Sequence, residues 1–212
     1  MYFSPCAAGK LKEALPPYST LVSANWHCVP CRKYMEEPLV DQLIVGYAHE
    51  VDGRLVATGS VTLIRTSKVN ILVDCGDPWN GDEIVEKLSS HGLQKQDVHV
   101  VIVTHGHIDH CGNLSLFPDA TRDPVALAPK VELRRCAGHT DHDLIAVVND
   151  TDKGCIVVAG DIFECANDGE QWREVSRYPE QQEKSRSEIL SLADWIVPGH
   201  GPMFKNEKSR SS

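Results

Sequence analysis

The sequence predicts an α+β protein in which β-sheets are packed between helices. Strand-like segments come first along the chain, and segments with helical spacing then alternate with further strands, twice over. That order favours sheets sandwiched between helices over one doubly wound sheet. The 212 residues suffice for one domain with a sizeable core, because domains commonly run to roughly 100–200 residues.

Residues 1–37 differ from the rest of the chain, since they mix proline, cysteine and short charged patches without sustained periodicity. We expect an irregular N-terminal appendage there, a domain over residues 38–204 and a polar tail over residues 205–212. The appendage contains Cys28-Val-Pro-Cys31, but the sequence has no second CxxC to complete a four-ligand zinc site. A zinc or redox role for this pair is therefore the less favoured interpretation.

The first half of the expected domain reads as a hairpin, a buried strand and a helix. The hairpin joins two strand-like segments through Asp52-Gly53, a dipeptide typical of such turns. The helix has Ile84, Val85 and Leu88 at helical spacing and ends before Gly92. The predicted elements are strands at 41–51, 54–65 and 69–76 and a helix at 81–91.

The second half alternates strands with one further helix. The segment VHVVIVTH is apolar at successive positions, which indicates an interior strand buried on both faces. The helix has Pro179 in its first turn, where proline is well tolerated. The predicted elements are strands at 98–105, 144–150 and 154–161, a helix at 179–194 and a last short strand and loop within 194–201.

The formal net charge of −9 gives no general attraction to nucleic acid or to anionic membranes. Basic residues gather only in small patches, which we interpret as solvated surface. Trp79 and Trp172 are interpreted as core or cleft-wall residues rather than as platforms for stacked bases. The basic patches are Arg134-Arg135, Lys184 with Arg186, and Lys205 with Lys208 and Arg210.

The sequence also indicates a compartment. The N-terminus has no unbroken apolar run of the roughly 7–15 residues that a signal peptide needs, and no stretch approaches the roughly 18 apolar residues of a membrane span. The eight cysteines are scattered and are expected to be free thiols. We therefore expect a protein of the cytosol, and also of the nucleus, without a membrane partner.

Four apolar segments stop abruptly in glycine together with histidine or aspartate. The ends of strands are where a sheet presents ligands to a cleft, and glycine lets the backbone approach closely. Taken alone, each such residue is more often a hydrogen-bonded polar group, a turn or a helix cap. The four segments lie at 105–112, 136–142, 157–163 and 196–202.

The first of these segments predicts a metal site on its own. His105 and His107 are two apart on an extended segment, so both side chains can point the same way, and Asp109 and His110 begin a helical turn. Imidazoles packed this closely would repel one another or stay unpaired without a cation. Imidazole and carboxylate ligands without thiolate suit zinc.

The four segments together resemble the metallo-β-lactamase superfamily, and the resemblance runs from about residue 40 to about residue 204. The stretches ILVDCGDPW, THGHIDHCGNLSLFP, VVAGDIFE and VPGHGP look like a narrower group within it, that of the metallo-β-lactamase domain-containing proteins. This resemblance implies a four-layer αββα sandwich with a site for two zinc ions at its edge.

The resemblance also implies how the ligands divide. One zinc ion would take His105, His107 and His139, the second would take Asp109, His110 and His200, and Asp161 would bridge both. Asp74 would orient a ligand without binding metal itself. His142 is a rival for His139, but it lacks the preceding glycine, so His139 is favoured.

The expected activity follows from the same resemblance. Its members include a zinc endoribonuclease of histone pre-mRNA 3′ ends, so hydrolysis of RNA by a metal-bridging hydroxide is expected, with Asp109, Asp161 and Asp74 in the catalytic site. A glyoxalase II-like thioester hydrolase is the alternative, and a non-catalytic scaffold is the second alternative. Persulfide-oxidising relatives share the histidine pattern with a single iron, which leaves the metal open. A homodimer is a further expectation.

One departure from the family concerns the connection between His110 and His139, which spans only 29 positions where the family has more. Pro118, Pro124 and Pro129 lie within this connection and leave room for one short strand at most. The completeness of the sheet is therefore in question, more than the identity of the ligands.

Overall fold

In the computed structural model, the described residues are 37–121 and 128–207. All of them belong to one compact unit. The appendage expected before residue 38 lies outside the described residues apart from Glu37, and so do Cys28, Cys31 and the basic residues Lys208 and Arg210.

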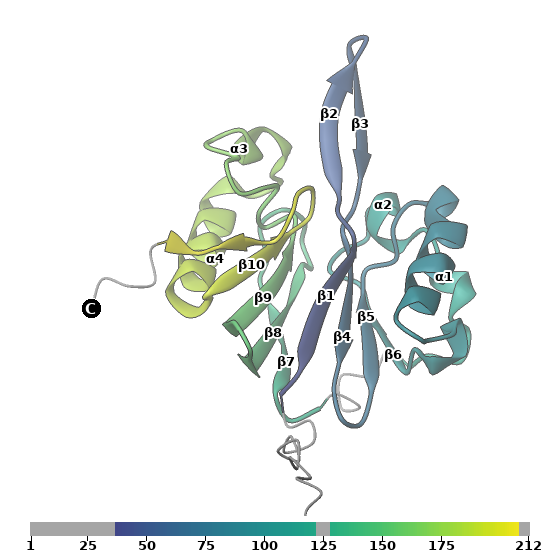
Figure 1. The fold of residues 1–212 in the computed structure, drawn as a ribbon. Coiled ribbons are helices and arrows are strands. Elements are labelled where there is room, and N and C mark those ends of the chain that lie inside the picture. The colour runs from purple at the N-terminus through teal and green to yellow at the C-terminus, as the bar shows by residue number, and fades with distance from the viewer. Residues whose placement is uncertain (1–36, 122–127, 208–212) are drawn as a thin grey trace, which may run out of the picture. The chain divides into compact units, whose positions relative to one another are not determined.

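Two mixed sheets form the middle of the molecule (Figure 1). In the first sheet, antiparallel pairing joins β1 to β4 and β4 to β5, and β5 pairs in parallel with β6. In the second sheet, β9 pairs in parallel with β10 and antiparallel with β8. The first sheet has the order β1 (Leu39–Ile44), β4 (Val61–Arg65), β5 (Asn70–Val73), β6 (Val100–Ile102), and the second has the order β11 (Phe204–Lys205), β10 (Trp195–Pro198), β9 (Gly154–Gly160), β8 (Leu144–Thr151), β7 (Val131–Arg135).

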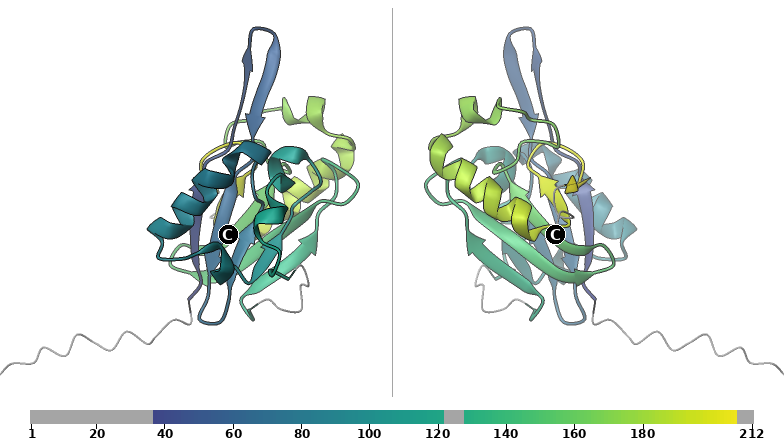
Figure 2. Two further views of the ribbon diagram at one scale, coloured as in Figure 1. Left: turned by 90° about the vertical axis from the view of Figure 1, so that its right-hand side faces the viewer. Right: turned by 90° about the vertical axis from the view of Figure 1, so that its left-hand side faces the viewer.

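Three apolar clusters show that the sheets lie between helices. Leu63 and Leu72 of the first sheet pack with Ile84 of α1 (Gly81–Ser90). The opposite faces of the two sheets pack on each other, with Ile71 in the same cluster as Val158. The far face of the second sheet packs on α4 (Pro179–Leu192) through Ile189. Figure 2 shows the two helices on the two outer faces. The predicted αββα sandwich is confirmed.

The predicted hairpin is divided differently from expectation. Its turn at Asp52-Gly53 is present, with φ of 50° and 72°. However, each long strand is broken near its middle, so that β2 (Tyr47–Val51) and β3 (Arg54–Thr58) form a separate two-stranded sheet that projects beyond the others (Figure 1).

Two glycines mark the points where the strands break. A side chain on Gly46 would collide with the backbone at Gly199, and one on Gly59 would come within 2.9 Å of the His110 imidazole. The chain at the hairpin base is therefore packed against two loops of the later strands, which alternation of apolar residues cannot reveal.

The two predicted helices are present as α1 and α4, and Pro179 is the first residue of α4. Shorter helical elements follow several strands, including the helical turn expected at Asp109 and His110. These short elements are η1 (Pro78–Asn80), η2 (Lys95–Asp97), α2 (Ile108–Cys111), η3 (Leu114–Leu116) and α3 (Trp172–Val175).

Within the described parts of the shortened connection, β7 is the one strand, as the prolines predicted. It pairs with β8 along its whole length, from Val131 opposite Val148 to Arg135 opposite Leu144. The second sheet therefore has its outer strand in spite of the short connection.

No helix among residues 37–121 and 128–207 is long and apolar enough to cross a membrane. The five cysteines within these residues are free thiols, in agreement with the sequence-based expectation.

Candidate metal centre

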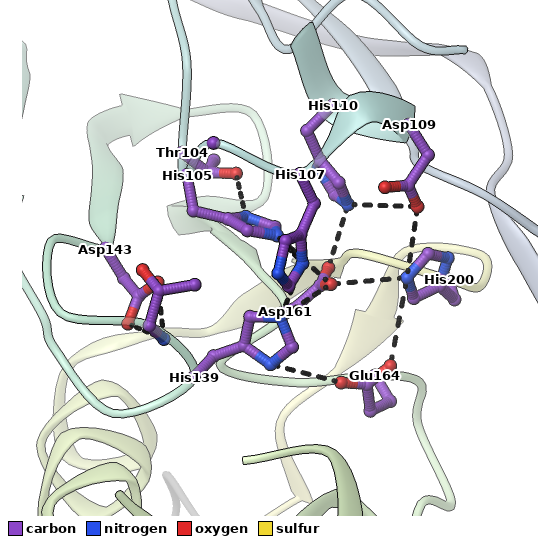
Figure 3. Close-up of polar contacts among 12 residues, drawn as sticks. Thr104, His105, His107, Asp109, His110, His139, Asp143, Asp161, Glu164 and His200 are labelled. Atoms are coloured by element: carbon purple, nitrogen blue, oxygen red, sulfur yellow. Dashed lines mark hydrogen bonds and ion pairs between the residues drawn. The ribbon is translucent and has the colours of Figure 1, made fainter. Parts of the chain in front are cut away.

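Histidines and aspartates from four segments of the chain meet at one edge of the sandwich (Figure 3). The loop after β6 and the helical turn α2 supply His105, His107, Asp109 and His110, and the loops after β7, β9 and β10 supply the other three. All seven residues that the sequence analysis selected as ligands are in this cluster: His105, His107, Asp109, His110, His139, Asp161 and His200. The rival His142 is exposed and outside it.

The first group of donors consists of three imidazoles and one carboxylate. Nδ1 of His107 lies 2.9 Å from Nε2 of His105 and 3.1 Å from Nε2 of His139. Oδ2 of Asp161 lies 3.4 Å from Nε2 of His105 and 3.3 Å from Nε2 of His139. These four atoms face a common point.

In the second group, the donor atoms of Asp109 are farther from their neighbours than the donors of the first group are from one another. Oδ2 of Asp109 lies 3.7 Å from Nε2 of His110 and 3.7 Å from Nε2 of His200. Asp161 reaches this group as well, with Oδ1 at 3.1 Å from Nε2 of His110 and Oδ2 at 3.3 Å from Nε2 of His200. Asp161 is thus the carboxylate that touches both groups.

The donor set fits a pair of zinc ions. Donor atoms about 2.0–2.2 Å from a four-coordinate zinc ion lie about 3.4 Å from one another, and the separations in both groups are between 2.9 and 3.7 Å. Nε2 of His110 and Oδ1 of Asp161 are buried without an aligned hydrogen bond. Such buried polar atoms are uncommon unless they have a ligand to bind.

In two of the ligand histidines, the outer ring nitrogen, meaning the one that points away from the cluster, is held by another group. Asp74, at φ 61°, accepts from Nδ1 of His110 at 2.8 Å and from the backbone and hydroxyl of Thr104 at 2.7 and 2.8 Å. Nδ1 of His200 contacts the carbonyl of Thr58 at 3.0 Å. These contacts leave the other nitrogen of each ring free for a metal.

The loop of His139 is shaped by Asp143, which the sequence analysis missed. Its carboxylate accepts hydrogen bonds from the backbone of Gly138 and from the backbone and hydroxyl of Thr140. Gly138 has φ 152°, and a side chain there would run into Gln182 of α4. The Gly-His-Thr motif gave a signal for the ligand but none for the acid four residues later.

The loop of Asp161 is held by α4. Nε2 of Gln182 donates to the carbonyl of Asp161 at 2.9 Å, and Arg186 donates to the carbonyl of Ile162 at 2.8 Å. Arg186 also forms a two-pronged ion pair with Asp168 and lies 4.0 Å over the Phe163 ring.

The interpretation of Arg186 as solvated surface is therefore wrong. Its side chain is only 13% exposed, because the paired Asp168 and the aromatic ring replace water around the guanidinium. By contrast, Lys184 of the same predicted patch is exposed.

The second group carries positive charge in the absence of metal. Burial would lower the pKa of His200, but its hydrogen bond to Asp161 and the charges of Asp161 and Glu164 raise that pKa to about 9. Burial also opposes protonation of His110, but the carboxylates of Asp161 and Asp74 raise its pKa well above the usual value. Burial would raise the pKa of Asp161, whereas His110, His105 and His200 hold it well below its usual range.

In the first group, by contrast, two of the histidines have lowered pKa values. Burial lowers the pKa of His139 to about 4, and burial followed by the neighbouring His105 lowers the pKa of His107. These imidazoles are therefore neutral at pH 7, which is the form that binds a metal ion.

Glu164 is a further acid at the centre that the sequence analysis did not select. Its oxygens lie 3.8 Å from Nδ1 of His139 and 3.8 Å from Nε2 of His200 (Figure 3). Burial, followed by the charge of Asp161, raises its pKa to about 8. It stands three residues after Asp161, where no spacing rule marks it as a site residue.

Two large apolar side chains are exposed, one on α2 and one on η1. Ile108 of α2 is 61% exposed, and Trp79 of η1, after β5, is 72% exposed. Of the two expected roles, core or cleft wall, exposure excludes the core for Trp79, whereas Trp172, which is 3% exposed, is a core residue.

Comparison with known proteins gives one family and several relatives. Residues 56–142 match the model of the metallo-beta-lactamase superfamily. The chain is 41% identical over 189 residues to metallo-beta-lactamase domain-containing protein 1 of Xenopus laevis, covering 78% of this chain and 81% of that protein. It is 36% identical over 230 residues to the protein of the same name from Homo sapiens, covering 94% and 86%.

Two more distant matches complete the comparison. A ribonuclease of Thermus thermophilus is 36% identical over 69 residues, which cover 32% of this chain and 16% of that protein. A solved structure from Thermotoga maritima, described as a metallo-beta-lactamase, has a TM-score of 0.65 at 21% identity and covers 80% of this chain and 99% of that one. At that identity, the likeness concerns the fold alone.

Proposed function

The chain belongs to the metallo-β-lactamase superfamily, and from that premise we propose that this metal-dependent hydrolase is a binuclear zinc enzyme that cleaves RNA. The observation that carries the binuclear part is the position of Asp161, whose carboxylate lies within 3.4 Å of donors from both groups. Among the described residues, Glu164 also lies near both groups, but its oxygens are farther away, at 3.8 Å from His139 and 3.8 Å from His200.

The chemistry needs both groups. A bound zinc pair would polarise the bond to be cleaved and lower the pKa of water from 15.7 to about 7. Asp161 aligns the two halves of the centre, and Asp74 fixes the ring of His110 so that Nε2 faces inward. His107 is exposed and Asp109 is partly exposed, so the centre is open to solvent on the side of these two residues, where Ile108 is exposed as well.

Two observations support RNA as the substrate. One is the local identity to a ribonuclease, which leaves out the remaining two thirds of this chain. The other is the exposed Trp79 of η1, whose neighbour Pro78 packs against Gly112 at the end of α2. An exposed aromatic ring near a cleavage site can stack on an unpaired base, a contact worth about 1–3 kcal/mol. A pre-mRNA substrate would require the enzyme to act in the nucleus, which is one of the two compartments, cytosol and nucleus, expected from the sequence.

A thioester hydrolase of the glyoxalase II type is the second candidate, and the charge distribution favours it. Asp74, Asp109 and Asp161 set three negative charges against the four positive charges of two zinc ions, so the loaded centre has little excess charge to attract a polyanion. The exposed Ile108 and Trp79 would equally suit an acyl chain. The complete set of donors argues against the third candidate, a scaffold without activity.

One assay separates the two enzymes. A labelled histone-type pre-mRNA fragment and S-lactoylglutathione are each incubated with wild type, His105→Ala and His110→Ala at two salt concentrations. We expect RNA cleavage by wild type alone, with a shallow salt dependence, since each neutralised phosphate of a single strand contributes a slope of only about −0.7.

The opposite results are equally clear. Equal RNA cleavage by all three proteins would identify a contaminating nuclease and remove the proposal. Turnover of the thioester without RNA cleavage would assign the protein to the thioester hydrolases instead.

We also propose that the chain is a homodimer. Every residue of β2 is exposed, including Val51, and Val56 on the facing strand β3 is exposed as well. An isolated two-stranded hairpin is at best marginally stable in water, so a second copy covering this surface would stabilise it. Sedimentation of wild type and Val51→Asp tests this, and a wild type that stays monomeric at all concentrations would contradict it.

A further inference from the structure

We propose that Glu164 is a positioning residue of the metal centre, which accepts a hydrogen bond from Nδ1–H of His139 and thereby turns Nε2 of that ring toward the first group. The inference rests on the proposed binuclear centre and adds a residue to it. It concerns a ligand histidine whose outer nitrogen is buried without a hydrogen-bond partner among the described residues.

The arrangement of the two side chains carries the proposal. Oε1 of Glu164 lies 3.8 Å from Nδ1 of His139, on the side of the ring that faces away from His107 (Figure 3). Both atoms are buried, and neither has a hydrogen-bond partner within residues 37–121 and 128–207. A buried donor and a buried acceptor left unpaired are unfavourable, and they face each other here.

The other histidines show what is missing at His139. The outer nitrogen of His110 has Asp74 at 2.8 Å, and that of His200 has the carbonyl of Thr58 at 3.0 Å. Ligand histidines almost always donate their second N–H to a carboxylate or a carbonyl. For His139, Glu164 is the carboxylate in place to do so.

The backbone of Glu164 is fixed in this position from two sides. Its N–H donates to Oδ2 of Asp168 at 3.1 Å, and its carbonyl accepts from the backbone N–H of His200 at 2.8 Å. Asp168 is in turn held by Arg186. Glu164 is therefore part of the loop that carries Asp161, and only its side chain has to rotate for Oε1 to reach a hydrogen-bond distance of about 3 Å.

The consequence concerns the form of the His139 ring. When Nδ1 carries the proton, Nε2 has the free lone pair, and Nε2 is the atom that lies 3.3 Å from Oδ2 of Asp161. Glu164 thus favours the tautomer that can bind a metal in the first group. The competing role is direct ligation, because Oε2 of Glu164 lies 3.8 Å from Nε2 of His200.

The experiment compares zinc affinity in four proteins by competition with a chromophoric chelator: wild type, Glu164→Ala, Glu164→Gln and Glu170→Gln. Loss of a partner that orients a ligand typically lowers metal affinity about 10- to 100-fold, and we expect this for Glu164→Ala. In Glu164→Gln, the amide oxygen of the new side chain would still accept from Nδ1–H, so this variant should lose less than about tenfold.

Glu170→Gln is the matched control. It is the same chemical change six residues along, on a side chain that is 79% exposed and paired with Arg173 outside the cluster. Its zinc affinity should equal that of wild type. Thermal unfolding of the metal-free proteins checks that each variant is folded before its affinity is compared.

A spectroscopic readout tests the hydrogen bond itself. In zinc-loaded wild type and Glu164→Gln, the Nδ1 proton of His139 should be protected and visible by NMR, and in Glu164→Ala it should exchange too fast to observe. A visible, protected proton in the Ala variant would contradict the proposal.

The affinities give three further outcomes. An unchanged affinity in Glu164→Ala would overturn the proposal while leaving the metal centre intact. Equal losses in the Ala and Gln variants would overturn it in favour of direct ligation by the carboxylate. A wild type that binds no metal would instead overturn the proposed centre, and this inference with it.

Discussion

Replacing Gly199 by alanine should damage the metal centre without touching any ligand. A Cβ at this position would overlap Oδ1 of Asp161 and lie 2.9 Å from its Cγ. The backbone of Gly199 cannot retreat, because its N–H donates to the carbonyls of Gly160 and Phe163 and its carbonyl accepts from the N–H of Ser60 at 2.7 Å. The carboxylate of Asp161 must therefore move.

The size of that movement sets the expected effect. To reach ordinary contact with the new methyl group, Oδ1 has to move by more than about 1 Å, whereas metal–ligand distances tolerate about ±0.2 Å. We expect zinc affinity to fall by at least about 10- to 100-fold, the loss that even indirect changes around a metal produce. The metal-free protein should lose about 1–3 kcal/mol of stability from overpacking.

Gly201→Ala is the control, since it introduces the same methyl group two residues later in the same loop. There the nearest atom is Cβ of Cys165 at 3.1 Å, and Asp161 is not among the neighbours. Zinc affinity is measured by chelator competition and stability by urea unfolding of the metal-free proteins. If Gly199→Ala binds zinc as tightly as Gly201→Ala, Asp161 does not bridge the centre.

Four further predictions test other parts of the structure. Chelation of the metal should lower the thermal midpoint, because zinc at 100 times its Kd adds about 2.7 kcal/mol of stability. For a domain of this size, that corresponds to roughly 5–10 °C. An unchanged calorimetric midpoint after verified metal removal would mean that the polar groups of the cluster are stable together without metal. The raised pKa of His200, about 9, stabilises the metal-free protein fully below pH 6.5 and is lost as the pH rises through 9, so urea unfolding should show roughly 2–3 kcal/mol less stability at pH 10 than at pH 7 from this group. Because metal ligation needs the neutral ring, zinc binding at pH 7 should also release protons from His200 and His110. Calorimetry in buffers of different ionisation enthalpy measures the number of protons released per zinc ion, and a number of zero would contradict this prediction. Arg186→Met should destabilise the fold by about 3–5 kcal/mol, because the buried Asp168 carboxylate loses its ion-pair partner. Lys184→Met should have little effect, and equal effects of the two substitutions in urea unfolding would refute the structural role of the Arg186–Asp168 ion pair.

The layers of the fold and the cluster of donors were predictable from the sequence for a physical reason. Apolar runs that end in glycine with histidine or aspartate report both the strand and the place where it stops. His139 and His200 lie 61 residues apart in the chain, yet His139 follows the end of β7 and His200 follows the end of β10. Residues with that signature were found, and the structure brings them together.

The residues that were missed act through contacts that leave no local pattern. Gly59, where the hairpin strand breaks, packs against the backbone carbonyl of Asp109 and the ring of His110, some fifty residues later. Arg186 looks like any helix-surface cation until Asp168 and Phe163 are seen beside it. Glu164 has no strand end of its own, and only the packing of its loop places it against His139. Each of these depends on tertiary neighbours rather than on sequence spacing.

The metal content of purified protein tests most directly whether two metal ions are held through one shared carboxylate. Elemental analysis of wild type and Asp161→Ala gives the number and kind of ions per chain. We expect two zinc ions in wild type and the loss of both in the variant, since Asp161 is the side chain that lies against both groups of donors. One iron and no zinc in wild type, or two zinc ions retained by Asp161→Ala, would contradict the shared-carboxylate centre.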